Sequence, residues 1–453
     1  MKKVQSILCK LAFLVLCIFM VTIIARLFIK NIVVEKLNVS NDFTVWALQG
    51  VSTVDAVDEV TGDTFAQIDW EKMYPFQNQS QDVEATEKKE SLISRYKQKV
   101  KYIENVVNDY CTSYLTHRTF FVEKAYAYDS LIHWNMTSKS EADGVVVLQN
   151  GYLAQTHNEC DIAPLAEHVN SLKDYVESQN IDFLYVQAPA KMSPVNKMLP
   201  AGVEDYSNEN ADQLIEKLEA YDVDTLDLRP YMFDIASDFY GAFYKTDHHW
   251  KTTTAFQMAG VLAEYLNNNY KYDFDSDYYN LDYYKVEHYV NYFLGSLGKK
   301  VTLSKADPED YDLIVPDFDT NFSIQIPERY IDQTGAFKDV LLDYRHLQTI
   351  DYYNENCFAS FMNRNDAVAS IHNNAPTCNN GKKILFIKDS YSTPLIPYIA
   401  LGVEDIETLY EIRFTGSVRT YIDQVQPDMV IVMYSADNIM GTGEGNTVPF
   451  SLE

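Results

Sequence analysis

The chain has 453 residues, of which 47% are hydrophobic, so it is long enough for one large domain or two ordinary ones with a real core. Its 65 acidic residues outnumber its 37 basic residues and give a formal net charge of −28. This acidity argues against nucleic acid and anionic lipid headgroups as partners, because both would repel the chain. A neutral glycan is compatible with it. The 34 tyrosines and 23 phenylalanines suit sugar-facing surfaces, and they suit cores and sheets at least as well.

The first part of the chain, residues 1–30, predicts a transmembrane signal-anchor. An uncharged apolar run from Leu11 to Ala25 lies between Lys10 and Arg26, and apolar residues on either side extend it toward the ~20 residues that cross a bilayer. A cleaved signal peptide is the alternative, but the bulky residues after the run contain no small-x-small cleavage site. We therefore expect a single-pass protein of the cell membrane, with everything after about residue 30 outside the cytoplasm.

Four of the six cysteines, Cys111, Cys160, Cys357 and Cys378, would then lie in a compartment where disulfides are permitted. Four cysteines allow three pairings, and the sequence does not choose between them. No C-x-x-C pair is present, so a structural zinc site is not expected.

Residues 31–140 are predicted to form a stalk and a helical lead-in. Up to about residue 86 the chain is acidic and poor in apolar runs, which is typical of a solvated linker. From Glu87 to Tyr128 apolar residues recur at three- and four-residue steps, which predicts a helix that packs on the main domain.

Beyond residue 140, strand patterns alternate with helical patterns. The apolar segments 145–148, 181–186 and 223–228 predict strands, and the segments 165–179 and 211–221 predict helices. This alternation indicates an α/β domain, residues 141–453, with a parallel sheet flanked by helices. Sites in such sheets form where the strands end and loops cross to helices.

Between about residues 270 and 380 the pattern changes. Tyrosine and aspartate dominate and short alternating segments appear, which predicts an antiparallel, β-rich insertion. The α/β pattern resumes at Lys383, with strands expected at 384–387 and 429–434 and helices at 395–401 and 418–425.

The segment before residue 252 carries the strongest chemical signal. Asp247, His248, His249 and Trp250 place an acid, two imidazoles and an indole at consecutive positions, in a chain with only 9 histidines and 4 tryptophans. A helix is expected to follow, with Thr252 as its N-cap and an end near residue 266.

A serine downstream supplies the natural partner of this segment. Serine is a weak nucleophile that needs a base within hydrogen-bond reach, and the base needs an acceptor that sets its tautomer. Ser390 follows a buried strand at the mouth of a helix, a position that exposes its hydroxyl and directs backbone N–H groups at a developing oxyanion. We expect His249 to be the base and Asp247 to orient it.

Plainer interpretations exist for each of these residues. Asp247 suits a turn, Trp250 a core anchor, and Ser390 a helix N-cap. An Asp-His-His cluster also suits a divalent ion, but no second cluster of ligands is evident and adjacent histidine side chains usually point apart. We therefore expect no metal and no other cofactor.

Three segments carry a resemblance to a known family: Asp247 to Trp250, Phe293 to Lys300, and Lys388 to Tyr391. They resemble the DHHW family of bacterial cell-surface proteins, which is similar to the SGNH-hydrolase-like domain of the periplasmic alginate O-acetylation proteins. The resemblance covers roughly residues 140–453. In those relatives the Asp-x-His-Trp motif precedes the serine.

The resemblance implies roles for individual residues. It makes Ser390 the nucleophile, His249 the base and Asp247 the orienting acid. It also implies that Arg413 and Tyr391 support the substrate or the oxyanion, while His248 falls on the variable position and its role stays open. Lys388 stands where ordinary SGNH enzymes have glycine, and Glu411 stands where the family's Asp-x-Arg segment has aspartate.

The function that the resemblance implies is O-acetyl transfer to, or removal from, a cell-surface polysaccharide through an acyl-serine intermediate. Such proteins often work beside a membrane-bound O-acyltransferase. Two alternatives remain open at this point. One is a non-catalytic glycan-binding or scaffold subunit of a polysaccharide modification complex, and the other is a metal-dependent hydrolase that uses Asp247 and His249.

Overall fold

A computed structural model describes residues 123–124, 126, 144–236, 238–362, 365–378, 380–410 and 413–439. All of them belong to the second of two units of the chain, Val122–Glu453. The predicted membrane segment, the stalk and most of the helical lead-in lie outside the described residues, as do Cys111 and Glu411. Among the helices that the structure describes, none is long and apolar enough to cross a bilayer.

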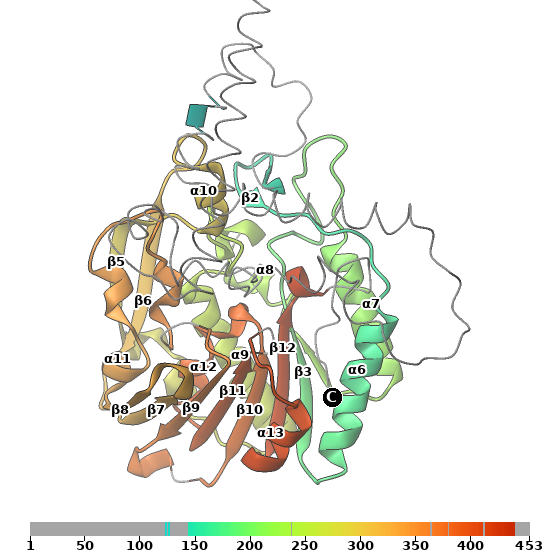
Figure 1. Ribbon diagram of the computed structural model, residues 1–453, viewed down its shortest axis with the longest axis vertical. Helices are drawn as coiled ribbons and strands as arrows, with labels where there is room; N and C mark the ends of the chain where they lie inside the picture. Colours follow the sequence, from blue (N-terminus) through green and yellow to red (C-terminus); the bar gives the residue numbers. More distant parts are fainter. Residues whose placement is uncertain are drawn as a thin grey trace, which may run out of the picture. The chain divides into compact units, whose positions relative to one another are not determined.

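The domain is built on an eight-stranded mixed sheet with the strand order β4-β3-β12-β10-β11-β9-β7-β8 (Figure 1). Its first five strands are parallel. They are β4 Thr225–Asp227, β3 Asp182–Ala188, β12 Met429–Ser435, β10 Lys383–Lys388 and β11 Asp405–Tyr410. All seven residues of β12 are buried, as expected for a strand that is covered on both faces.

The other three strands of the sheet are antiparallel. They are β9 Val368–Asn373, β7 Phe322–Ile326 and β8 Ile331–Gly335. The sequence predicted a parallel sheet with a separate antiparallel, β-rich insertion, and the structure instead joins the antiparallel strands to the parallel ones in one sheet. The sheet is mixed because alternate residues of β7 are buried and pack its inner face on the common core. Two further pairs stand apart: β1 Val146–Val147 with β2 Leu153–Ala154, and β5 Tyr284–Phe293 with β6 Glu309–Pro316.

Helices cover both faces of the parallel strands. Side chains of β10 alternate between two hydrophobic clusters, with Leu385 and Ile387 in one and Ile384 and Phe386 in the other. The first cluster includes α6 Ala163–Glu177, α7 Ser207–Ala220 and α13 Val418–Val425. The second includes α9 Thr252–Tyr270 and α12 Ile396–Ile399.

Short helical segments complete the domain. The α-helical ones are α8 Met232–Ile235, α10 Ser296–Val301 and α11 Phe337–Val340. The 3₁₀ turns are η3 Phe239–Ala242, η4 Ser276–Tyr279, η5 Leu281–Tyr283, η6 Pro327–Arg329, η7 Tyr344–Leu347, η8 Cys357–Ser360, η9 Pro376–Cys378, η10 Ser390–Ser392 and η11 Ala436–Asn438.

The helix after the histidine motif differs from the expectation at both ends. Its N-cap is Lys251, and Thr252 is its first helical residue. The Thr252 hydroxyl donates to the carbonyl of Asp312 at 2.6 Å, so it ties α9 to β6 and is not free to cap the helix. The helix also continues to Tyr270, four residues past the predicted end. Among the described cysteines, no disulfide joins any two of Cys160, Cys357 and Cys378.

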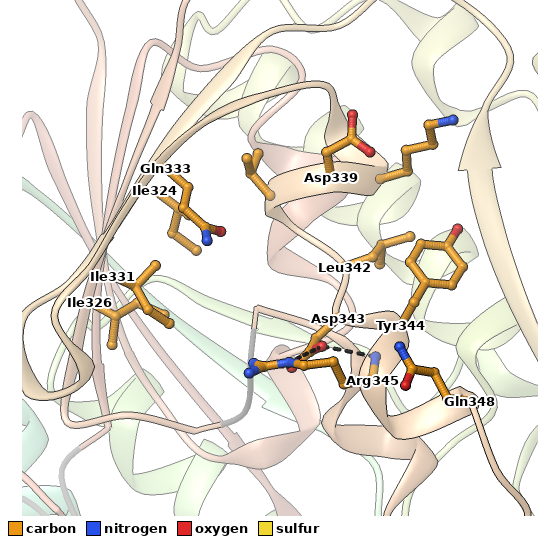
Figure 2. A pocket seen from close by; sticks show the side chains of 12 residues that line it. Ile324, Ile326, Ile331, Gln333, Asp339, Leu342, Asp343, Tyr344, Arg345 and Gln348 are labelled. Atoms are coloured by element: carbon orange, nitrogen blue, oxygen red, sulfur yellow. Dashed lines mark hydrogen bonds and ion pairs between the residues drawn. The ribbon is translucent and has the colours of Figure 1, made fainter.

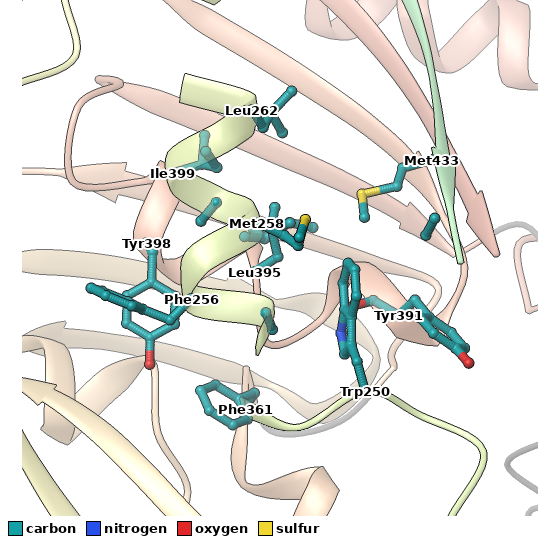
Figure 3. Close-up of a cluster of buried hydrophobic side chains, with 14 of the residues drawn as sticks. Trp250, Phe256, Met258, Leu262, Phe361, Tyr391, Leu395, Tyr398, Ile399 and Met433 are labelled. Atoms are coloured by element: carbon teal, nitrogen blue, oxygen red, sulfur yellow. The ribbon is translucent and has the colours of Figure 1, made fainter. Parts of the chain in front are cut away.

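Trp250 is the largest fully buried side chain and joins the histidine motif to the serine turn. Its indole Nε1 donates to the carbonyl of Tyr391 at 3.0 Å, and the two rings pack with their centroids 5.4 Å apart. Figure 3 shows Trp250 lying between the start of α9 and the turn that carries Tyr391. Trp250 is therefore a core anchor that also positions the site.

Replacement of Trp250 by phenylalanine tests this anchor. Trp250→Phe removes the indole donor and leaves the Tyr391 carbonyl buried without it, and it also leaves a cavity. We expect the free energy of unfolding to fall by about 2–4 kcal/mol. Urea titration of the full-length chain measures it, with Val195→Ala as a control because Val195 is 82% exposed. Equal midpoints for Trp250→Phe and the wild type would contradict the assignment.

Candidate active site

The serine lies on a turn that is tied to two strands. Asp389, the residue after β10, accepts the backbone N–H of Tyr391 on Oδ1 at 2.9 Å. Its Oδ2 accepts the N–H of Ser435 at 2.6 Å and the side-chain amide of Asn438 at 2.8 Å. Asp389 thereby fixes the turn to the end of β12, and Ser390 sits at the carboxyl edge of the parallel strands, where such folds form sites.

The histidine motif lies at the same edge, in the loop that enters α9. The backbone N–H of His249 donates to Asp247 Oδ1 at 3.0 Å, and the ring Nδ1 lies 2.6 Å from the same oxygen. The other ring nitrogen, Nε2, lies 2.7 Å from Ser390 Oγ. The structure thus brings Ser390, His249 and Asp247 together in one hydrogen-bonded chain. We assign the proton of the ring to Nδ1, so that Nε2 is the acceptor of the serine hydroxyl.

The Asp247 carboxylate is buried and fully engaged. Its second oxygen, Oδ2, accepts the backbone N–H of Ser296 at 2.6 Å. Burial alone would raise the pKa of the Asp247 carboxyl, but the neighbouring His248 and His249 and the hydrogen bonds to its oxygens hold that pKa well below its usual range. Asp247 is therefore ionised at every pH at which the site would work.

The segment before α10 approaches the aspartate closely. A Cβ on Gly295 would lie 2.3 Å from the Cβ of Asp247, which is closer than any real contact. Its N–H donates to Thr246 Oγ1 at 2.9 Å, and the N–H of Gly298 donates to the Thr246 carbonyl at 2.8 Å. Glycine is required at position 295 because the backbone itself packs on Asp247.

Two rings enclose the imidazole of His249. The ring of His248 lies 3.7 Å away between centroids, and the ring of Phe358, in η8, stacks on it at 3.9 Å with an interplanar angle of 17°. His248 Nδ1 lies 3.0 Å from Ser296 Oγ. Burial, and next the neighbouring His249, lower the pKa of His248 to about 3, so His248 is neutral at physiological pH. Its side chain is 11% exposed and lies beside the reacting atoms.

The remaining predicted support residues have different positions. Tyr391 is buried, and its hydroxyl lies within hydrogen-bond distance of the His248 carbonyl and of Asp437 Oδ2. Arg413 lies in the turn after β11, where its charge acts on Asp366 and Lys388. Tyr391 therefore joins the serine turn to the histidine loop, and Arg413 lies beyond the end of the strand next to β10.

Lys388 is almost fully buried beneath the serine turn. Its Nζ donates to Asn365 Oδ1 at 2.7 Å, to Thr393 Oγ1 at 2.8 Å and to the Asp389 carbonyl at 3.3 Å. Burial lowers the pKa of Lys388 to about 7, and Arg413 adds to this effect. Lys388, at the position where ordinary SGNH enzymes have glycine, therefore stabilises the serine turn through hydrogen bonds to residues before and after it.

Asp247, His248 and His249 also meet the distance requirement for a metal site, since one ligand atom from each lies within 4.8 Å of the others. Both ring nitrogens of His249 and both oxygens of Asp247 already have partners in the serine arrangement. An ion would have to displace these hydrogen bonds, so the donor set fits a triad better than a metal centre. A second such group, His372, Glu404 and Asp405, lies at the amino end of β11, the opposite edge of the sheet.

A cavity of about 460 Å³ lies beside the hairpin of β7 and β8 (Figure 2). Its floor is apolar, with Ile324, Ile326 and Ile331, and the ion pair of Asp343 with Arg345 lies at its rim. None of the three triad residues lines it. The backbone N–H of Asp343 donates to the carbonyl of residue 360, so the cavity wall adjoins η8, which carries Phe358.

Sequence reasoning missed several residues that build the site. Ser296 and Gly295 lie in a segment that carried the family resemblance, but the sequence did not indicate that they contact Asp247 in space. Phe358 had no signal, because an aromatic residue in a tyrosine-rich stretch is ordinary. Asp389 lies within the segment Lys388 to Tyr391 that carried the resemblance, but no role was predicted for it.

Comparisons with known proteins agree with this architecture. Residues 148–295 match the family model described as the SGNH hydrolase-like domain of the acetyltransferase AlgX. The match includes Asp247, His248 and His249 and ends before Ser390. No curated protein sequence matches the chain.

Solved structures share the fold. Bacillus cereus PatB1 is 19% identical, with 66% of this chain and 98% of that chain covered and a TM-score of 0.55. A structure of the same protein with a sulfonyl adduct has 18% identity, the same coverage and a TM-score of 0.53. A DHHW family protein from Eubacterium siraeum is 18% identical, with 68% of this chain and 95% of that chain covered and a TM-score of 0.52. The resemblance inferred from the three motifs is confirmed.

Gly295→Ala tests the close packing on Asp247. The added methyl group must push the aspartate away, and a displacement of about 1 Å at a catalytic group lowers the rate about 100-fold. We expect the rate at which a fluorophosphonate probe labels Ser390 to fall by that factor. The matched control is Gly335→Ala, where the new Cβ would meet its neighbours at an ordinary 3.5 Å. Equal labelling rates in both variants would show that the contact does not matter.

Lys388 predicts a dependence of stability on pH. Its pKa is about 7 in the folded chain and ordinarily 10.5, so between these values the unfolded chain binds more protons. The free energy of unfolding therefore rises with pH in this window, by up to about 1.4 kcal/mol per pH unit from this one group. We expect Lys388→Met to show a shallower rise than the wild type in urea titrations from pH 7 to 9. Lys382→Met, at a partly exposed position, should keep the wild-type slope, and equal slopes for Lys388→Met and wild type would refute the prediction.

Proposed function

We propose that this chain, which resembles the SGNH hydrolase-like acetyltransferase domain over residues 148–295, is a serine O-acetyltransferase or acetylesterase that acts on a cell-surface polysaccharide. One observation carries the proposal: Ser390 Oγ, both ring nitrogens of His249 and Asp247 Oδ1 are linked by contacts of 2.7 and 2.6 Å. A nucleophile, a base and an orienting acid in this order are what acyl transfer requires.

Acylation begins at the serine. The Ser390 hydroxyl gives its proton to His249 Nε2 as Oγ attacks the carbonyl carbon of an acyl donor. Asp247 stabilises the imidazolium that forms and stays ionised. The tetrahedral adduct then collapses, the bond to the leaving oxygen breaks, and that oxygen takes the proton from His249 Nε2. The acyl group is left as an ester on Ser390.

Deacylation repeats the same steps with a second oxygen. A sugar hydroxyl gives its proton to His249 Nε2 and attacks the acyl carbon, and Ser390 Oγ leaves and recovers the proton. Water in place of the sugar hydroxyl gives hydrolysis. The difference between transferase and esterase therefore depends on which hydroxyl reaches Nε2 first.

The oxyanion needs donors near Ser390. The N–H of Tyr391 is taken by Asp389, so it does not serve this role in this arrangement. Ser390 is the first residue of η10, a position whose N–H has no acceptor within a helical turn, and we assign the oxyanion contact to this group. Neutral His248, which borders His249 and keeps some exposure, is the nearest side chain for further support.

The substrate class follows from charge and from the relatives. A chain with a net charge of −28 favours a neutral acyl donor and a neutral glycan as acceptor. The matching family model names an acetyltransferase, and PatB1 forms a sulfonyl adduct, the product expected when a sulfonylating reagent meets an activated nucleophile. We propose a tether through residues 1–30, an extracytoplasmic site, and a membrane-bound O-acyltransferase as the partner that supplies the acyl group.

Hydrolysis of p-nitrophenyl acetate by the full-length chain, purified in detergent, tests the proposal. We expect turnover in the wild type, and we expect Ser390→Ala and His249→Ala to lower kcat at least about 1,000-fold, because the residues of such a triad act as a unit. Ser304→Ala is a matched control on an exposed serine outside the site. Addition of a polysaccharide and mass spectrometry of the glycan distinguish transfer from hydrolysis.

Three outcomes would overturn the proposal. Turnover that survives Ser390→Ala excludes an acyl-serine intermediate. Turnover that a chelator abolishes and a divalent ion restores favours a metal-dependent hydrolase at Asp247 and His249. Absence of both turnover and probe labelling at Ser390, with retained glycan binding, favours a non-catalytic subunit.

A further inference from the structure

A buried amine contacts the backbone of the histidine loop. Lys191 follows β3 and is only 2% exposed. Its Nζ donates to the backbone carbonyl of Asp247 at 2.6 Å and to that of Lys245 at 2.9 Å. The same nitrogen lies 5.3 Å from the centre of the Tyr152 ring. Lys191 thus binds the backbone of the residue whose carboxylate orients His249.

A carboxylate binds the opposite side of the same segment. Glu309, at the start of β6, accepts the backbone N–H groups of Lys245 and Thr246, each at 2.7 Å, and the Thr246 hydroxyl. The peptide groups from 245 to 247 are therefore held on their carbonyl side by an amine and on their amide side by a carboxylate. A residue that follows β3 and a residue of β6, far apart in the sequence, both bind this one segment.

Charged groups from several segments of the chain act on Lys191. Glu309, Asp247 and Asp437 favour its charged form, whereas Lys245 disfavours it. Burial dominates and lowers the pKa of Lys191 to about 7. An amine at this position is charged below about pH 7, and it has two N–H donors for its two carbonyls even when it is neutral.

We propose that Lys191 is a positioning residue for the triad: it holds the Asp247 backbone so that the carboxylate meets His249, and it places a positive charge next to the buried Asp247. The kinetic part of this inference rests on the proposed function. An apolar side chain would fill the space at lower cost than a buried amine, so burial alone does not account for a lysine here.

Two substitutions separate the roles of the hydrogen bonds and the charge. Lys191→Met keeps the length of the side chain and removes both. Lys191→Gln keeps two N–H donors and removes the charge. The control is Lys197→Met, because Lys197 also donates to a backbone carbonyl, that of Asp205, but lies outside the site.

The first readout is the pH profile of p-nitrophenyl acetate hydrolysis by the full-length chain. We expect Lys191→Met to lower kcat about 10- to 100-fold with little change in KM, because the substitution displaces a catalytic group and Lys191 itself does not touch the substrate. In both Lys191 variants the acidic limb of the profile should move to higher pH by about one unit, since a buried positive charge that interacts with Asp247 is lost from the site. Lys191→Gln should have a higher kcat than Lys191→Met, but its acidic limb should be shifted by the same amount.

The second readout needs no turnover. The proton between His249 Nδ1 and Asp247 should give a far-downfield NMR resonance, assigned by its loss in His249→Ala. We expect Lys191→Met to shift or remove it and Lys197→Met to leave it unchanged. If the wild type proves inactive, this resonance still tests Lys191, so failure of the proposed function is distinguishable from failure of this inference.

The proposal would be overturned by variants that fold, as judged by circular dichroism and urea midpoints, and keep the wild-type acidic limb and resonance. A fall in kcat without movement of the limb in either variant would also overturn it, because a merely structural role predicts that result. If Lys191→Met does not fold, Lys191→Gln decides the question alone.

Discussion

The site depends on one buried carboxylate. Asp247 accepts three N–H groups, two from His249 and one from Ser296, and these contacts set the direction in which the imidazole presents its second nitrogen. A carboxylate with this many donors stays ionised despite burial. The orientation of the His249 ring follows from the position of Asp247, and three further residues help to keep Asp247 in place. Gly295 lets the backbone approach it, and Lys191 and Glu309 bind the loop that carries it.

The sheet explains why residues 141 positions apart can share a proton. Parallel strands end at the same edge, so the turn after β10 and the loop into α9 meet there once α9 packs on the strands. Trp250 fixes the position of the two segments relative to each other, since it is buried between them and its indole donates a hydrogen bond to the serine turn. The antiparallel strands add Phe358 through η8, which covers one face of the imidazole.

Local patterns predicted much of this arrangement. The apolar runs at β3, β10 and β12 and the cluster at Asp247 to Trp250 are signals within short windows, and they placed Ser390, His249 and Asp247 correctly at one sheet edge. The mixed character of the sheet was beyond reach, because pairing of β7 with β9 depends on contacts between distant segments and not on their own composition. The same holds for Lys191 and Phe358, whose importance lies only in what they touch. Thr252 shows that a local rule can fail for a single residue. The rule assigned its hydroxyl to helix capping, but the hydroxyl donates to a backbone carbonyl of β6, which is distant in the sequence.

The rings of His248 and Phe358 pack against the His249 imidazole and oppose a rotation that would exchange its two nitrogens. One nitrogen is held by Asp247, so a single lone pair must serve every proton transfer in a catalytic cycle. The departing oxygen of a donor and the incoming oxygen of an acceptor then have to occupy the same spot at different times. In the proposed acyl transfer, a donor and an acceptor that compete for this one position would inhibit each other at high concentration, and the rate plotted against the concentration of either one would pass through a maximum.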